Sequence, residues 1–170
     1  LQRIQELEEL RVTIENKGKC ESDDVRATFI SKNVLDDFSI TIQDTLKTWH
    51  FPGAERVYFD DSSKDLVISG DMRSNHGKGL RAITHAAFNI ALLEYCYKND
   101  LAHPGFVLLD SPLLTYREPS SDEDNLKGSD LKNHFYEHLA NLAKNIQIII
   151  IENEQPPEYL RDRIKYHFFT

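Results

Sequence analysis

Two short, mostly apolar segments constrain the fold of this chain more than any other feature. FVLLD occupies residues 106–110, and IQIIII occupies residues 146–151. Neither alternates apolar with polar residues, as a strand with one wet face would, so the pattern predicts strands covered on both faces. An amphipathic segment over 129–145 predicts a helix between them. Strand, helix and strand in this order predict a parallel pair and therefore an α/β layer fold.

Helix-capping residues, turn residues and Pro or Gly breaks predict five further elements. They are a helix over 31–49, strands over 55–60 and 64–70, a helix over 79–99 and a last helix over 158–168. The two strands are joined by Asp61-Ser62-Ser63, which predicts a hairpin. The helix over 79–99 is apolar around most of its circumference, so we expect it to be buried.

Charge and cysteine content limit the classes of function. The 170 residues include 28 acidic and 20 basic side chains, for a net charge of −8. This balance argues against nucleic-acid binding by this segment alone, because phosphate contacts need clustered Lys and Arg. No apolar run approaches the roughly 18 residues of a membrane span. Cys20 and Cys96 have no metal or disulfide spacing, which fits a reducing compartment, and we expect a cytoplasmic location.

An acidic residue ends the first apolar segment. Asp110 follows four apolar residues, which puts its carboxylate at the carboxyl edge of the predicted sheet, where α/β folds bind ligands. A carboxylate there can hold a water of a Mg²⁺ ion bound to nucleotide phosphates. The same residue also suits the first position of an Asp-Ser-Pro turn, which is a purely structural role.

A loop of small and polar residues precedes the long helix. It consists of Ser74, Asn75, His76, Gly77, Lys78 and Gly79. Small residues let the backbone approach a ligand, and the N–H groups at a helix N-terminus attract anions. Ser74 adds a hydroxyl group and Lys78 a positive charge. The loop is no P-loop, because Gly79 follows Gly77-Lys78 where Ser or Thr is needed. An ordinary glycine-containing loop with a helix cap is the alternative.

The order of these features resembles the C-terminal half of the ATPase head of SMC, RecN and SbcC-type proteins, a branch of the ABC ATPases. The order is hairpin, Ser/Gly helix start, buried helix, FVLLD strand, helix and IIII strand. The resemblance implies that residues 28–170 form the C-terminal lobe of such a P-loop NTPase head, with a largely parallel sheet flanked by helices and a small hairpin. It implies that residues 1–27 are the end of a coiled-coil arm and its connection, with the apolar stripe of residues 1–14 as the returning arm helix.

The resemblance also implies roles for particular residues. Residues 73–77 match the position of the signature motif, so Ser74 would contact the γ-phosphate of ATP held by the opposite head. Asp110 matches the Walker B aspartate and would hold Mg²⁺ through water. Residues 113–117 fall at the D-loop, and Asn153 falls at the switch histidine.

Several positions depart from the family pattern. Ser111 follows Asp110 where the family has its catalytic glutamate. Asn75-His76 replaces two glycines, Arg117 replaces the D-loop aspartate, and Asn153 replaces a histidine. Candidates for a displaced general base are Glu118, Glu152 and Glu154. An atypical branch of the family is therefore expected.

The resemblance implies an ATPase that binds and hydrolyses ATP between two dimerised heads, in DNA repair, chromosome maintenance or phage defence. Its implied partners are a P-loop lobe from the same chain, a second and identical head, DNA through the intact protein, and a nuclease, without a membrane. The isolated fragment is expected to be inactive. The alternative is a nucleotide-gated interaction module with little hydrolysis, which Ser111 and Asn153 favour.

A competing motif lies in the helix expected over 129–145. His134, Glu137 and His138 fit the H-x-x-E-H pattern of inverted zinc peptidases. Histidines four residues apart share a helix face and can bind one zinc ion. The polar face of an ordinary amphipathic helix gives the same pattern, with Leu131 and Phe135 on its apolar face.

Overall fold

The computed structural model describes residues 30–113, 129–142 and 146–168. The arm helix expected within residues 1–27 lies outside this part of the chain. The same holds for Glu118 and for residues 114–117 of the expected D-loop.

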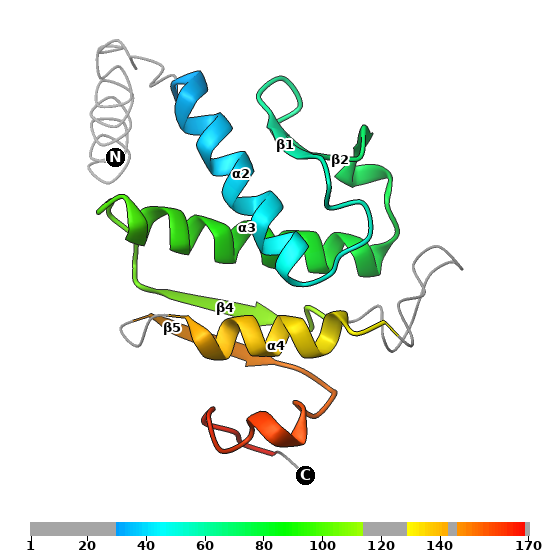
Figure 1. Cartoon of the computed structure of the whole chain (residues 1–170), viewed down its shortest axis with the longest axis vertical. Coiled ribbons are helices and arrows are strands. Elements are labelled where there is room, and N and C mark those ends of the chain that lie inside the picture. Colours follow the sequence, from blue (N-terminus) through cyan, green and yellow to red (C-terminus); the bar gives the residue numbers. More distant parts are fainter. Residues whose placement is uncertain (1–29, 114–128, 143–145, 169–170) are drawn as a thin grey trace, which may run out of the picture. The chain divides into compact units, whose positions relative to one another are not determined.

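Two helices and a hairpin form the first half of the described chain (Figure 1). Helix α2 (Lys32–Thr48) buries one stripe that includes Phe38, Ile42 and Leu46, and it packs on helix α3 (Lys78–Lys98). Strands β1 (Val57–Asp60) and β2 (Asp65–Ile68) pair in antiparallel register from Val57–Ile68 to Asp60–Asp65. The two helices and the hairpin were predicted. A short third strand, β3 (Asp71–Met72), pairs with β2. This strand was not predicted.

The two apolar segments form a parallel pair, as predicted. Strand β4 (Phe106–Asp110) pairs with β5 (Gln147–Ile151) from Phe106–Gln147 to Asp110–Ile151. Helix α4 (Leu131–Asn141) lies between them in the chain and runs beside the strands (Figure 1). The described part of the chain is therefore mixed α/β, with one small parallel sheet and one three-stranded antiparallel sheet.

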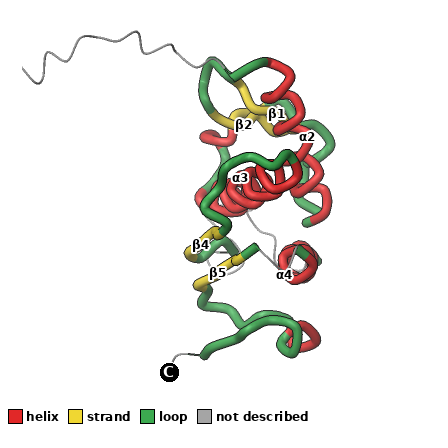
Figure 2. The backbone as a smooth tube through the Cα atoms, turned by 90° about the vertical axis from the view of Figure 1, so that its left-hand side faces the viewer, coloured by secondary structure: helices red, strands yellow, loops and turns green. Residues whose placement is uncertain are grey.

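The expectation that both faces of the parallel strands are covered is wrong for the described residues. Val107 and Leu109 are buried in the core, whereas Phe106 and Leu108 are 51% and 54% exposed. Ile149 and Ile151 on β5 are exposed as well. The physical reason is that α4 lies on one side of the strands, and no described element lies on the other (Figure 2).

The prediction of a last helix over 158–168 is also wrong. Only a single 3₁₀ turn forms there, η3 (Glu158–Leu160), and turns follow it. Leu160 is fully buried, but it is the only such residue in the segment. A helix this short is marginal in water without a continuous buried stripe.

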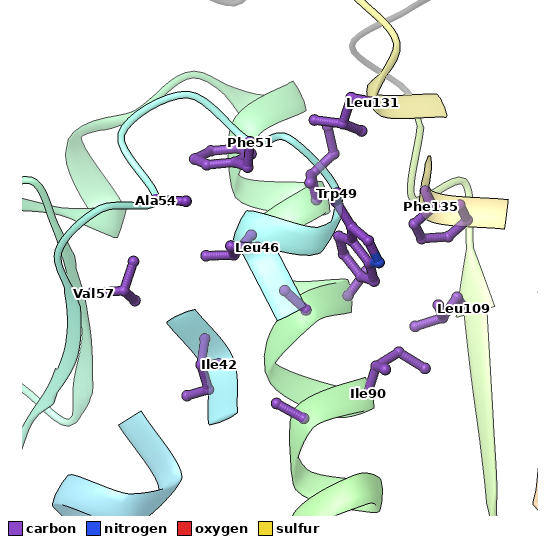
Figure 3. Packing of buried hydrophobic residues seen from close by; sticks show 14 of the residues in the cluster. Ile42, Leu46, Trp49, Phe51, Ala54, Val57, Ile90, Leu109, Leu131 and Phe135 are labelled. Carbon is purple, nitrogen blue, oxygen red and sulfur yellow. The ribbon is translucent and has the colours of Figure 1, made fainter. Parts of the chain in front are cut away.

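Trp49, just after α2, is a large buried member of the core (Figure 3). Its indole is fully buried and packs edge to face on Phe135 of α4, with ring centroids 4.8 Å apart. Ile90 of α3 and Leu109 of β4 belong to the same cluster. Trp49 thus connects the helical half to α4 and the parallel strands. None of the described helices is both long enough and apolar enough to span a membrane.

Candidate functional site

The carboxyl edge of the parallel sheet brings together polar residues from two strand ends. Asp110 is the last paired residue of β4 and lies opposite Ile151, and Glu152 follows Ile151 directly. Because the two strands are parallel, both acids lie at the same edge of the sheet. The N–H of Ser111 donates to the carbonyl of Ile151 at 2.8 Å, which continues the pairing past the end of β4. Ser111 then adopts a left-handed conformation, with φ 51°, and its Oγ donates to Asp110 Oδ1 at 2.9 Å. The predicted turn at Asp110 therefore forms, and the Asp110 carboxylate stays exposed.

Glu152 joins the two strand ends. Its Oε1 accepts a hydrogen bond from the N–H of Leu113 at 2.7 Å, and its Oε2 accepts one from the N–H of Asn153 at 2.9 Å. Leu113 is almost fully buried, so this contact fixes the turn that begins at Asp110. Sequence reasoning named Glu152 as a possible base but missed this bridging role. Asn153 itself is exposed at the same edge.

The remaining acid of this region is paired with a lysine. Glu154 Oε2 accepts a hydrogen bond from Lys132 Nζ at 2.7 Å, so it is not a free base. The neighbouring Tyr136 is buried, and burial together with the charges of Glu152 and Glu154 raises the pKa of its phenol well above the ordinary value. Tyr136 therefore stays protonated at physiological pH and acts here as a packing residue.

An ion pair fixes the loop that contains Ser74. Arg73 donates from Nε to Asp65 Oδ1 at 2.6 Å and from its guanidinium NH₂ to Asp65 Oδ2 at 3.1 Å. This bidentate pair links β2 to the 3₁₀ turn η1 (Arg73–Asn75). Ser74 is exposed on that turn, and Asn75 donates to Asp71 at 2.7 Å. The residues that fix the loop were missed, because Asp65 and Arg73 match no motif.

Helix α3 begins directly after this loop. Gly77 is its N-cap, and no side chain makes a capping hydrogen bond there. The first N–H groups of a helix have no intrahelical acceptor, so the uncapped start at Lys78 and Gly79 is a potential anion contact. His76 Nε2 is buried and has no partner among the described residues.

The predicted site residues thus fall into two groups, and the structure does not join them. One group is Asp110, Ser111, Glu152 and Asn153, and the other is Ser74 to Gly79. Helix α3 and strand β4 run in opposite directions, so the helix start and the strand end lie toward the same side (Figure 1). Within the described residues, no hydrogen bond or ion pair connects the groups.

No family model matches the chain, and no curated protein matches it.

The two histidines of the H-x-x-E-H motif, His134 and His138, do not converge on one metal position in the structure. His138 accepts a hydrogen bond at Nδ1 from Trp49 Nε1 at 2.9 Å, and its Nε2 lies 3.5 Å from Glu94. His134 instead contacts Asp130 through Nε2 at 3.1 Å. Because both ring nitrogens of His138 have other partners, the two histidines do not share a metal position.

Replacing Asp65 by Asn is expected to lower the free energy of unfolding by about 1–2 kcal/mol at pH 7, the range for a charge-assisted pair. Burial raises the pKa of Asp65, but the hydrogen bonds from Arg73 and Leu66 outweigh it and hold that pKa below the ordinary value. The stabilisation is therefore complete above the unfolded pKa of about 4 and disappears as pH falls through the lower folded pKa.

Urea unfolding of both proteins at pH 7, 5 and 3 tests this prediction. The exposed Asp36→Asn exchange is the matched control and should change stability little at any pH. A stability difference for Asp65→Asn that persists unchanged at pH 3 would contradict it.

Proposed function

We propose that this chain is the C-terminal lobe of an SMC/RecN-like ATPase head. In this proposal, two heads enclose two ATP molecules. Each composite site combines a P-loop lobe and Asp110 of one head with Ser74 and the start of α3 of the other. ATP binding joins the heads, and hydrolysis releases them, which is a two-state switch driven by phosphate contacts.

The observation that carries the proposal is the carboxyl edge of β4 and β5. Asp110 ends a half-buried parallel strand with its carboxylate exposed, and Ser111 bonds to only one of its oxygens, Oδ1. Mg²⁺ prefers oxygen ligands and keeps several waters, so an exposed carboxylate of this kind fits a water-mediated contact to the ion. Mg²⁺ bound with ATP would neutralise phosphate charge at this edge.

The exposed outer face of the parallel strands supports a second lobe. Phe106, Leu108 and Ile151 are each more than half exposed, although strands of this composition are normally covered on both sides. Within the described residues, each strand pairs with only one neighbour. The proposed occupant of this face and of the free strand edge is the P-loop lobe of the same head.

The separation of the two residue groups agrees with a shared site between heads. Within the described residues, no hydrogen bond or ion pair joins the Ser74 group to the Asp110 group. In the proposal they belong to different nucleotides, so no contact within one lobe is needed.

Glu152 favours a second candidate function, a nucleotide-gated module with little hydrolysis. Position 111 is a serine, and both oxygens of Glu152 accept backbone hydrogen bonds. A carboxylate held in this way is poorly placed to accept a proton from an attacking water. ATP would then dimerise the heads without rapid turnover.

The Ser74→Arg exchange tests both candidates in the intact protein, including the proposed P-loop lobe. The longer charged side chain should block the contact with the opposite nucleotide, so we expect ATP-dependent dimerisation to be lost by light scattering. Ser62→Arg places the same side chain on the exposed hairpin turn and should leave dimerisation unchanged. Dimerisation by ATP that survives Ser74→Arg would refute the shared site, and so would ATP turnover by the isolated 170-residue chain.

A further inference from the structure

Three side chains that can bind a metal converge where α2 ends and α4 begins. His50 lies two residues after α2, Asp130 is the N-cap of α4, and His134 is one turn into that helix. Asp130 Oδ2 lies 3.0 Å from His50 Nδ1 and 3.1 Å from His134 Nε2. These three atoms all lie within 4.8 Å of one another. The two imidazole rings also contact each other, tilted by 35° with centroids 3.8 Å apart.

The backbone at His50 adopts a conformation that favours glycine. The N–H of His50 donates to the carbonyl of Lys47, and the N–H of Phe51 donates to that of Leu46, which together form a Schellman motif. His50 occupies the left-handed position of that motif, with φ 56°. Glycine is the usual residue there, since a Cβ atom strains the left-handed region. The imidazole of His50 is thus held at a position where helix termination alone would favour Gly.

The carboxylate of Asp130 also does not make the hydrogen bond that is usual at its position. An aspartate at an N-cap normally accepts a hydrogen bond from an N–H of the first helical turn. Asp130 makes no such side-chain bond, and both of its oxygens face the two histidines instead. His50 and Asp130, 80 positions apart in the chain, therefore contact each other through side-chain atoms that neither helix end needs for its own structure.

We propose that His50 Nδ1, Asp130 Oδ2 and His134 Nε2 bind one zinc ion. Imidazole nitrogen and carboxylate oxygen are common zinc ligands, and three protein ligands leave a fourth position for water. With bonds of about 2.0–2.1 Å, tetrahedral ligand atoms lie about 3.3 Å apart, close to the spacing of Asp130 Oδ2 from each histidine nitrogen.

The surroundings fit an accessible site. The side chains of His50 and Asp130 are about half exposed and that of His134 about one third, so an ion can enter from solvent. Bound zinc replaces the hydrogen bonds between the three groups and links the end of α2 to the start of α4. It thereby acts as a cross-link beside Trp49, independent of the Asp110 edge and of the ATPase proposal.

The test uses the tag-free 170-residue chain, stripped of metal by a chelator and titrated with ZnCl₂ by calorimetry. We expect one equivalent to bind and the melting temperature to rise by roughly 5 °C at saturating zinc. Cobalt should give the visible absorption of a tetrahedral ion at the same stoichiometry.

Two variants remove ligands without disturbing the backbone. His50→Gly keeps the left-handed position favourable, and Asp130→Asn keeps a good N-cap residue. Each should weaken zinc binding by at least about tenfold and abolish the rise in melting temperature, while the metal-free chain stays folded by circular dichroism. His85→Ala, at an exposed position of α3, is the control and should bind zinc as the parent does.

Two results would overturn the proposal. One is that the parent chain binds no zinc at about 100 μM. This concentration is about 100-fold above the micromolar range in which a specific site should bind. The other is binding that His50→Gly and Asp130→Asn leave unchanged, because the ion would then be held by other surface histidines.

Discussion

Replacing Trp49 by Ala is expected to lower the free energy of unfolding by about 3–5 kcal/mol, the range for removing a large buried aromatic side chain. The indole is fully buried, packs edge to face on Phe135, and donates from Nε1 to His138 Nδ1. The exchange therefore removes apolar burial, leaves a cavity between α2 and α4, and deprives a histidine nitrogen of its donor. A loss of this size is a large part of the stability of an ordinary domain.

The Trp49→Phe exchange separates these contributions. It keeps an aromatic ring against Phe135 but removes the donor to His138, so we expect an intermediate loss of about 1–3 kcal/mol. Urea unfolding should be followed by circular dichroism, since Trp49 is the only tryptophan and its fluorescence disappears with it. Tyr97→Ala, at a position 54% exposed on α3, is the control and should cost less than about 1 kcal/mol. Equal losses for Trp49→Ala and Tyr97→Ala would contradict the central role of Trp49.

Local patterns were sufficient to predict most of the elements. The helix expected over 31–49 forms as α2, and Phe38, Ile42 and Leu46 lie on its buried face. The apolar run that ends at Asp110 predicted β4 and its parallel partner. These predictions succeeded because helix and strand periods are properties of short segments.

The failures have a common physical reason, since they depend on what covers an element. The sequence of β4 and β5 cannot say which face receives α4, so Phe106 and Leu108 were expected to be buried. The segment over 158–168 contains helix-forming residues, but only Leu160 among them is buried. Such outcomes are decided by tertiary packing, which overrides local propensity.

The candidate site was predicted in its positions but not in its contacts. The turn at Asp110 and the loop at Ser74 could be located from residue type and order. The contacts that fix them, from Glu152 to Leu113 and from Asp65 to Arg73, could not. The His50–Asp130 contact spans 80 residues and likewise leaves no local pattern. Long-range side-chain pairs of this kind follow only from the folded chain.

Replacing Asp110 by Asn in the intact protein is expected to lower kcat for ATP hydrolysis by roughly 100-fold, if the ATPase proposal holds. Loss of a charged contact to the Mg²⁺ shell removes several kcal/mol of transition-state stabilisation, and about 2.7 kcal/mol corresponds to this factor. The amide keeps the size of the side chain and an oxygen to accept the Ser111 hydrogen bond, so the turn should stay intact. Half-maximal activity should also require more Mg²⁺.

Steady-state turnover, measured across a range of Mg²⁺ concentrations, distinguishes the two candidate functions. Asp36→Asn makes the same chemical change at an exposed position of α2 and should leave kcat and the Mg²⁺ requirement unchanged. Substantial turnover that Asp110→Asn does not reduce would remove Asp110 from the metal site and with it the observation that carries the ATPase proposal. Negligible turnover in both proteins, with ATP still dimerising the parent, would favour the nucleotide-gated module. In that case the serine at position 111 and the carboxylate of Glu152, whose two oxygens each accept a backbone hydrogen bond, would explain why the heads join without hydrolysis.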